Sequence, residues 1–146
     1  MAFDVIYTTS EFPADLNNDN DIKTHDSLIQ NGNLGLVNLG GTICRQVDFA
    51  PGYTTFMHRT KSLDYGVVIQ GQIVLTLDSG EKQILEPGDV AIQRATNHAW
   101  TNPSQTEWTR MMFVLQECRS VEIEGTTLEE YHERPVDGIP LSQKLQ

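Results

Sequence analysis

The feature that most constrains the fold is a series of short strand-like runs through the middle of the chain. Each run is rich in β-branched and aromatic residues, is bounded by Gly, Pro, Asp or Asn, and follows its neighbour without an intervening helical pattern. Regularly spaced runs of this kind predict an all-β fold, an antiparallel sandwich or barrel. The runs cover residues 34–39, 42–49, 54–60, 65–70, 72–77, 82–85, 90–93, 98–102 and 107–115.

The segment before these runs has a different composition. Residues 1–33 are expected to form an N-terminal arm, in which 5–9 have strand character. Residues 11–33 are rich in Asn, Asp, Gly and Pro, so they are predicted to be mainly loop. The barrel is then expected to span residues 34–117.

The segment after the barrel, residues 118–146, is expected to form a C-terminal tail. Residues 126–132 begin with a threonine N-cap followed by acidic residues, which predicts one short helix, ended by Pro135. Residues 136–146 are expected to be an extended arm. A chain of 146 residues fits a single domain that contains all three parts.

Composition excludes several classes of function. The formal net charge is −10 and no basic patch is visible, which argues against nucleic acid and against anionic membrane surfaces as partners. No apolar run approaches the length of a membrane span and the first residues do not resemble a signal peptide, so we expect a cytoplasmic protein. Cys44 and Cys118 lack metal-site spacing and are expected to be buried, inert thiols.

Three polar residues in the strand-like region are the strongest candidates for chemistry. Strand residues alternate between faces, so His58 shares a face with Phe56 and Thr60, and His98 shares one with Trp100. If the large apolar and imidazole groups point inward, His58, Asp64 and His98 converge in the mouth of the barrel. Two imidazoles and a carboxylate are then gathered from three strands.

At these positions the chain resembles the cupin family. The first family motif runs Gly, five residues, His-x-His, three or four residues, Glu, six residues, Gly. Gly52, His58 and Gly71 match this pattern, whereas Thr60 stands in place of the second His and Asp64 in place of the Glu.

The second family motif also matches in part. It runs Gly, five residues, Pro-x-Gly, two residues, His, three residues, Asn. Gly88, His98 and Asn102 match, while residues 94–96 replace Pro-x-Gly and one residue fewer precedes the histidine. The resemblance covers roughly residues 34–117 and implies a cupin-type barrel or jelly roll.

The resemblance implies a metal site, and the residues leave its survival open. Two histidines and a carboxylate still form a facial triad with open positions, so His58, Asp64 and His98 are expected ligands for a divalent metal such as Zn, Fe, Mn or Ni. No organic cofactor is expected. Without metal, the same residues form an acid–base set that moves a proton. The third interpretation is a polar cluster with no catalytic role.

Neighbouring side chains are expected to shape the substrate pocket. Apolar and aromatic walls suit a small aromatic or polyketide-like molecule. An arginine that shares a face with an inward Trp108 is expected to bind a carboxylate or phenolate, and Arg45 is another candidate for that role. The predicted substrate-binding residues are Phe56, Thr60, Gln93, Trp100, Arg110 and Met112.

Three functions follow from this site. The first is a lyase, a dehydratase or decarboxylase of secondary metabolism, which the resemblance to stand-alone cupins implies. The second is a metal-dependent oxygenase, and the third is a cupin that binds a small ligand without catalysis. Because cupins commonly pair, we expect a homodimer that acts on a small molecule.

Overall fold

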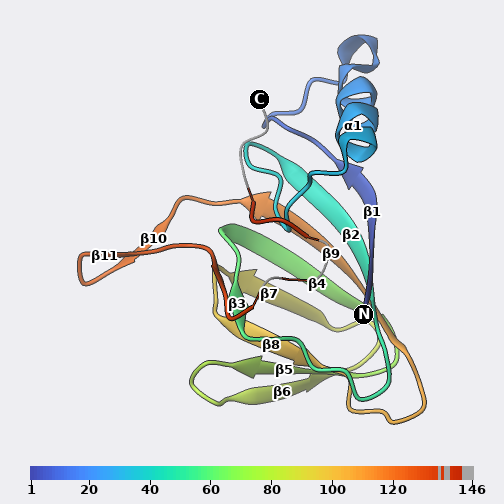
Figure 1. Cartoon of the computed structure of the whole chain (residues 1–146), viewed down its shortest axis with the longest axis vertical. Coiled ribbons are helices and arrows are strands. Elements are labelled where there is room, and N and C mark those ends of the chain that lie inside the picture. The colour runs from blue at the N-terminus through green and yellow to red at the C-terminus, as the bar shows by residue number, and fades with distance from the viewer. Residues whose placement is uncertain (135, 137–138, 143–146) are drawn as a thin grey trace.

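The protein is described by a computed structural model that covers residues 1–134, 136 and 139–142 (Figure 1). Within these residues, the strands form two five-stranded sheets and one two-stranded hairpin, and every strand pair is antiparallel. The predicted all-β antiparallel fold is therefore confirmed. The elements are β1 (Ala2–Thr8), η1 (Asn17–Asp19), α1 (Asn20–Asn31), β2 (Thr42–Phe49), β3 (His58–Arg59), β4 (Ser62–Gln70), β5 (Ile73–Leu77), β6 (Lys82–Leu85), β7 (Val90–Arg94), β8 (His98–Thr101), β9 (Thr109–Glu117), β10 (Val121–Ile123), β11 (Thr126–Leu128) and β12 (Tyr131–His132).

The two large sheets draw on strands that are far apart in the sequence. Sheet A has the order β1-β2-β9-β4-β7, and sheet B has the order β12-β3-β8-β5-β6. Strand β1 from the N-terminal arm pairs with β2, and β12 from the tail pairs with β3. Both flanking segments thus add a strand to the sheets, and do not merely wrap a barrel that ends at residue 117.

The core lies between the two sheets. Strand β2 alternates strictly between half-buried and buried residues, so Ile43, Val47 and Phe49 face inward. On the neighbouring β9, Met111 and Leu115 do the same. Burial of each such side chain stabilises the fold by roughly 1.5–3 kcal/mol. A shift of one residue in the strand pairing would expose these side chains, so their burial also determines which polar residues face inward.

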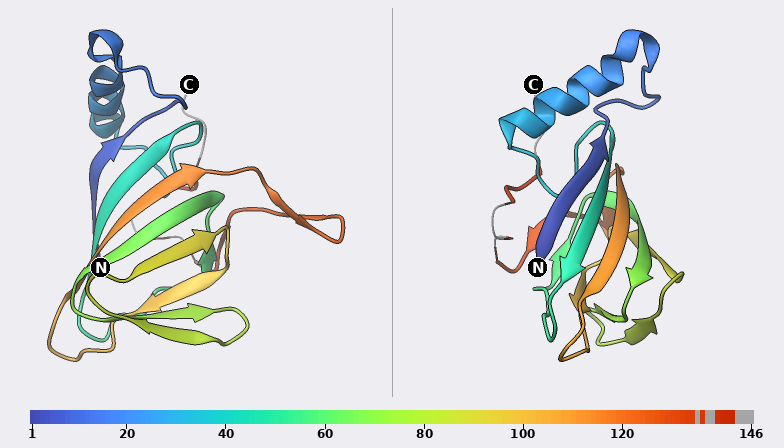
Figure 2. Two further views of the ribbon diagram at one scale, coloured as in Figure 1. Left: turned by 180° about the vertical axis from the view of Figure 1, so that it is seen from behind. Right: turned by 90° about the vertical axis from the view of Figure 1, so that its right-hand side faces the viewer.

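The predicted loop over residues 11–33 is partly wrong, because residues 20–31 form α1. The helix lies beyond one end of the sheets, against the end of β1 (Figure 2). Tyr7 of β1 stacks on His25 with ring centroids 4.6 Å apart and donates a hydrogen bond to Asp21. Of the helix residues only Leu28 is buried, so these tertiary contacts hold a helix that carries almost no apolar stripe.

The predicted helix over residues 126–132 is wrong. Strands β10 and β11 form a hairpin there, and the hairpin projects away from both sheets (Figure 1). Its turn residues, Glu124 at φ 47° and Gly125 at φ 78°, are both left-handed, as a two-residue hairpin of the I′ type requires. The predicted extended arm, residues 136–146, lies partly outside the described residues.

The predicted strand over residues 34–39 is also wrong. These residues form bends and turns. Leu36 and Val37 are nevertheless buried in the main core cluster. The apolar pattern therefore predicted the burial of this segment correctly and its secondary structure incorrectly.

Candidate functional site

A cavity of about 200 Å³ lies between the two sheets, and seven of the candidate site residues named above line it. Asp64 comes from β4 of sheet A, whereas His58 and His98 come from β3 and β8 of sheet B. These three residues therefore face one cavity, as the alternation of strand residues predicted. The seven candidate residues in the lining are Arg45, Phe56, His58, Thr60, Asp64, His98 and Trp100.

The two histidines lie directly opposite each other on paired strands. His58 and His98 are register partners, and their ring centroids are 4.4 Å apart. The Nδ1 of His58 hydrogen-bonds the Phe56 carbonyl oxygen at 2.9 Å, and the Nδ1 of His98 hydrogen-bonds the Thr96 carbonyl oxygen at 2.7 Å. Because a carbonyl oxygen only accepts, each Nδ1 carries the proton and each Nε2 keeps its lone pair.

Both imidazoles are held neutral by their surroundings. Burial, together with the neighbouring His58, lowers the pKa of His98 to about 3. Burial also lowers the pKa of His58. At neutral pH the pair therefore offers two hydrogen-bond acceptors and no positive charge.

Asp64 is the acidic member of the site and is only 4% exposed. Burial raises its pKa to about 6, although hydrogen bonds donated by the hydroxyls of Ser62 and Thr60 act in the opposite direction. A carboxyl group with this pKa changes its charge close to neutral pH. Thr60, in the place of the family's second histidine, thus serves as a hydrogen-bond donor to Asp64 at 3.2 Å.

The strand that carries Asp64 also makes room for the cavity wall. At Gly66, an added Cβ would lie 2.8 Å from the ring of Phe113 on β9, which is closer than carbon atoms pack. The absence of a side chain at Gly66 therefore leaves room for the Phe113 ring. Phe113 in turn contacts Trp100 in a T-shaped arrangement, with centroids 5.6 Å apart, and both rings line the cavity.

The donor atoms fit a metal ion only in part. Among the described residues, no group of three or more His, Cys, Asp or Glu side chains is arranged to hold a metal ion. His58 and His98 do have the form of metal ligands, because each Nδ1–H donates to a carbonyl oxygen and neither Nε2 has a hydrogen-bond partner in the described part of the chain. Asp64 is engaged by Ser62 and Thr60 instead. Metal binding by His58, Asp64 and His98 stays a prediction.

Three predicted substrate-binding residues do not line this cavity. They are Gln93, Arg110 and Met112. The expectation that Arg110 and Met112 face inward together with Trp108 is wrong. Trp108 is 50% exposed, and Arg110 forms an ion pair with Asp48 on the outer surface, with Nε to Oδ1 at 2.7 Å. Met111, on the opposite face of β9, is the fully buried residue. Gln93 is buried, next to Asp64 in the register, but does not reach the cavity.

Sequence reasoning missed the contribution of the C-terminal tail. His132 of β12 pairs with His58 in the register, stacks on it with centroids 6.2 Å apart, and lines the cavity. Its Nε2 hydrogen-bonds Glu130 at 3.1 Å, while its Nδ1 is buried and has no hydrogen-bond partner among the residues that the structure describes. Three imidazoles thus form a row across β12, β3 and β8. The alternation of Tyr131 and His132 over two residues is too short a signal to predict this strand.

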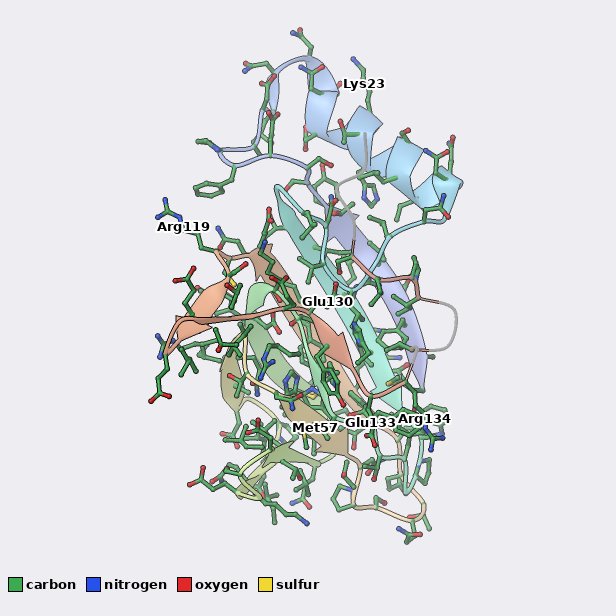
Figure 3. The ribbon with its side chains drawn as sticks, turned by 60° about the vertical axis from the view of Figure 1, so that its left-hand side comes forward. Lys23, Met57, Arg119, Glu130, Glu133 and Arg134 are labelled. Atoms are coloured by element: carbon green, nitrogen blue, oxygen red, sulfur yellow. The ribbon has the colours of Figure 1, made fainter. Side chains whose placement is uncertain are left out.

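Arg134 follows His132 on the same segment and also lines the cavity. Its guanidinium carbon lies 4.7 Å from the centre of the Phe56 ring, a cation–π contact. Figure 3 shows Glu130, Glu133 and Arg134 along this C-terminal segment as it passes beside the strands. The segment therefore supplies part of one wall of the cavity.

The two cysteines, which were expected to be buried, are only partly so. Cys44 and Cys118 are free and half-buried, and burial raises the pKa of both thiols, which favours the unreactive form. Within the part of the chain that the structure describes, no helix is long and apolar enough to span a membrane.

Comparisons with known proteins agree with the fold. The family model described as "Cupin domain" matches residues 45–115. Phomopsin biosynthesis cluster protein D of Diaporthe leptostromiformis is 49% identical over 126 residues, which is 86% of this chain and 66% of that protein. The cupin-domain-containing oxidoreductase fogC of Aspergillus ruber is 43% identical, over 87% of this chain and 62% of that protein.

A third relative is covered over more of its length. Oryzines biosynthesis cluster protein J of Aspergillus oryzae is 38% identical, over 88% of this chain and 71% of that protein. The chain spans about two thirds of the length of these curated relatives, and less than two thirds of the oxidoreductase. The relatives include enzymes and proteins of fungal biosynthetic clusters. With its two-sheet fold, its matching motifs and these relatives, the chain belongs to the cupin family.

Proposed function

We propose that the chain is an enzyme of secondary metabolism that moves a proton on a small aromatic or polyketide-like molecule. The observation that carries this proposal is the pairing, in one cavity, of a carboxyl group of pKa about 6 with two neutral histidines. A group whose pKa lies near the working pH is suited to take up and return a proton. The presence of biosynthetic-cluster proteins among the relatives supports the substrate class.

The favoured reaction is an elimination, catalysed by a lyase that acts as a dehydratase. Asp64, ionised, accepts a proton from a carbon next to a substrate carbonyl. The electron pair of that C–H bond forms the new double bond as the neighbouring C–O bond breaks. Asp64 returns its proton to the leaving hydroxyl, which departs as water, so the step balances without another reagent. His58 and His98 accept hydrogen bonds at Nε2 and orient the substrate hydroxyls.

A metal-dependent oxidoreductase, including the oxygenase, is the second candidate. Several relatives carry the name cupin-domain-containing oxidoreductase. The Nε2 atoms of His58 and His98 are donors of the kind that Zn, Fe, Mn and Ni accept. A bound iron or manganese ion would supply the redox chemistry, and the chain's own cavity would position the substrate beside the two imidazoles.

One experiment separates the candidates. The purified protein, with or without prior removal of metal ions by a chelator, is incubated with a panel of aromatic and polyketide-like β-hydroxy ketones and β-keto acids. The masses of the products are then determined by mass spectrometry. Loss of water or carbon dioxide that survives chelation supports the lyase. Oxygen consumption that needs an added metal supports the oxidoreductase instead. Binding without any product would leave only the non-catalytic ligand-binding function.

A further inference from the structure

Arg45 is a buried arginine in the wall of the same cavity. It lies in the middle of β2, points inward, and is only 4% exposed. Its Nε donates to the carbonyl oxygen of Leu36 at 3.2 Å, and its Nη2 donates to the carbonyl oxygen of Gly35. Both acceptors are neutral, so these bonds fix the guanidinium in place without balancing its charge.

No described carboxylate balances that charge either. The ion pairs among the described residues are Arg110 with Asp48 and Glu130 with His132, and Arg45 belongs to neither. Burial lowers the pKa of Arg45 to about 10, which still leaves the group protonated at neutral pH. A buried charge is costly unless an opposite charge or a set of hydrogen bonds accompanies it.

The balance of charge in the cavity differs from that of the whole chain. The net charge of the chain is −10. Of the described residues that line the cavity, however, Arg45 and Arg134 are cationic, Asp64 is the one carboxyl group, and the rest are mostly apolar. An acidic protein therefore places two guanidinium groups around a space of about 200 Å³.

We propose that Arg45 is the receptor for an organic oxyanion, a carboxylate in the first instance, on an otherwise apolar ligand. The planar guanidinium fork matches a carboxylate better than any other side chain does, and its burial strengthens the contact. This inference rests on the proposed function, because it assigns the substrate class of the same cavity.

The position of Arg45 fits such a ligand. Arg45 is the register partner of Phe113, whose ring meets Trp100, and Trp100 meets His98 with centroids 5.5 Å apart. Phe113 and Trp100 thus connect Arg45 to His98 through a series of neighbouring residues that line the cavity. A ligand whose anionic end contacts Arg45 lays its apolar body along Phe113 and Trp100 and presents its other end to the histidines.

The test uses two probes of one shape that differ in charge, naphthalene-2-carboxylate and naphthalene-2-carboxamide. Their affinities for the whole chain are measured by titration calorimetry, with the fluorescence of the buried Trp100 as a second signal. The wild type is expected to bind the carboxylate roughly 10- to 100-fold more tightly than the amide, the range of a charged hydrogen bond. Arg45→Gln is expected to lose that preference and keep its affinity for the amide.

Two further variants sharpen the result. Arg119→Gln removes an exposed arginine that points away from the barrel (Figure 3) and is expected to keep the preference. Arg45→Lys keeps the charge without the fork, so an intermediate preference is expected, and this variant serves if Arg45→Gln does not fold. Equal affinity of the wild type for both probes, no binding of either, or an undiminished preference in the folded Arg45 variants would overturn the inference.

This outcome is independent of catalysis. If turnover is never found while the preference depends on Arg45, the proposed reaction fails and the anion site stands. If turnover is found and the preference is absent, the anion site fails and the proposed reaction stands.

Discussion

The buried carboxyl group of Asp64 makes the sharpest prediction about stability. In the unfolded chain its pKa is the ordinary aspartate value of 3.8, whereas in the folded chain it is about 6. The difference is about 2 pKa units, and at 1.36 kcal/mol per unit it is worth about 3 kcal/mol. Because the folded pKa is raised, the folded state binds the proton more tightly. This stabilisation is complete below the unfolded pKa and is lost as the pH rises through about 6.

Asp64→Asn removes the titrating group and keeps its shape. An asparagine still accepts a hydrogen bond from Ser62 and can donate one to Thr60. The free energy of unfolding of Asp64→Asn minus that of the wild type is therefore expected to rise by about 3 kcal/mol between about pH 4 and pH 7. Any packing difference between the two side chains is present at every pH and does not alter this rise.

The measurement is a series of denaturant unfolding curves across that pH range. Asp78→Asn, in the exposed turn between β5 and β6, is the matched control for loss of one negative charge from an acidic chain. It is expected to show a much smaller change with pH. A difference between Asp64→Asn and the wild type that is flat with pH, or that falls, would refute the assignment of a raised pKa to Asp64.

Three further predictions concern metal, packing and assembly. If the chain is a metal-dependent oxidoreductase, the chelated wild type binds one equivalent of added Zn, Fe, Mn or Ni, as measured by elemental analysis, and His98→Ala binds none. A wild type that binds no metal would exclude this function. Gly66→Ala forces a methyl group against Phe113 and is expected to destabilise the fold by about 1–3 kcal/mol in thermal melts, whereas an unchanged melting temperature would contradict the contact. The predicted homodimer is tested by sedimentation at micromolar concentration, where a monomer would contradict it.

The convergence of His58, Asp64 and His98 in one cavity could be predicted from the sequence. Strand alternation and motif spacing placed His58 and His98 on inward faces, and the antiparallel register then sets them directly opposite. Asp64 follows from the same alternation on β4, where Ser62, Asp64 and Gly66 share a face. These residues lie in regular strands with strong polar–apolar contrast, which is the condition under which a period of two residues can be read.

The predictions that failed concern segments without such a contrast between polar and apolar faces. Both faces of β9 are apolar, with Met111 on one and Met112 on the other, so the large Trp108 suggested the wrong inward face. Helix α1 has only three strongly apolar residues, Ile22, Leu28 and Ile29, and it contacts Tyr7 of β1 through His25. His132 joins the cavity through a strand of two residues whose pairing with β3 is a long-range contact. Tertiary contacts, which local sequence does not encode, decided each case.

The central claim is that Asp64 transfers the proton in this cavity, and the pH dependence of turnover tests it most directly. With a substrate from the panel, kcat/KM of the wild type is expected to rise with pH through about 6, as the Asp64 carboxyl group ionises. Asp64→Asn is expected to lower kcat/KM by roughly 10²- to 10⁴-fold and to remove that rise. A wild-type profile without a step near pH 6, or the same step and the same rate in Asp64→Asn, would contradict the claim.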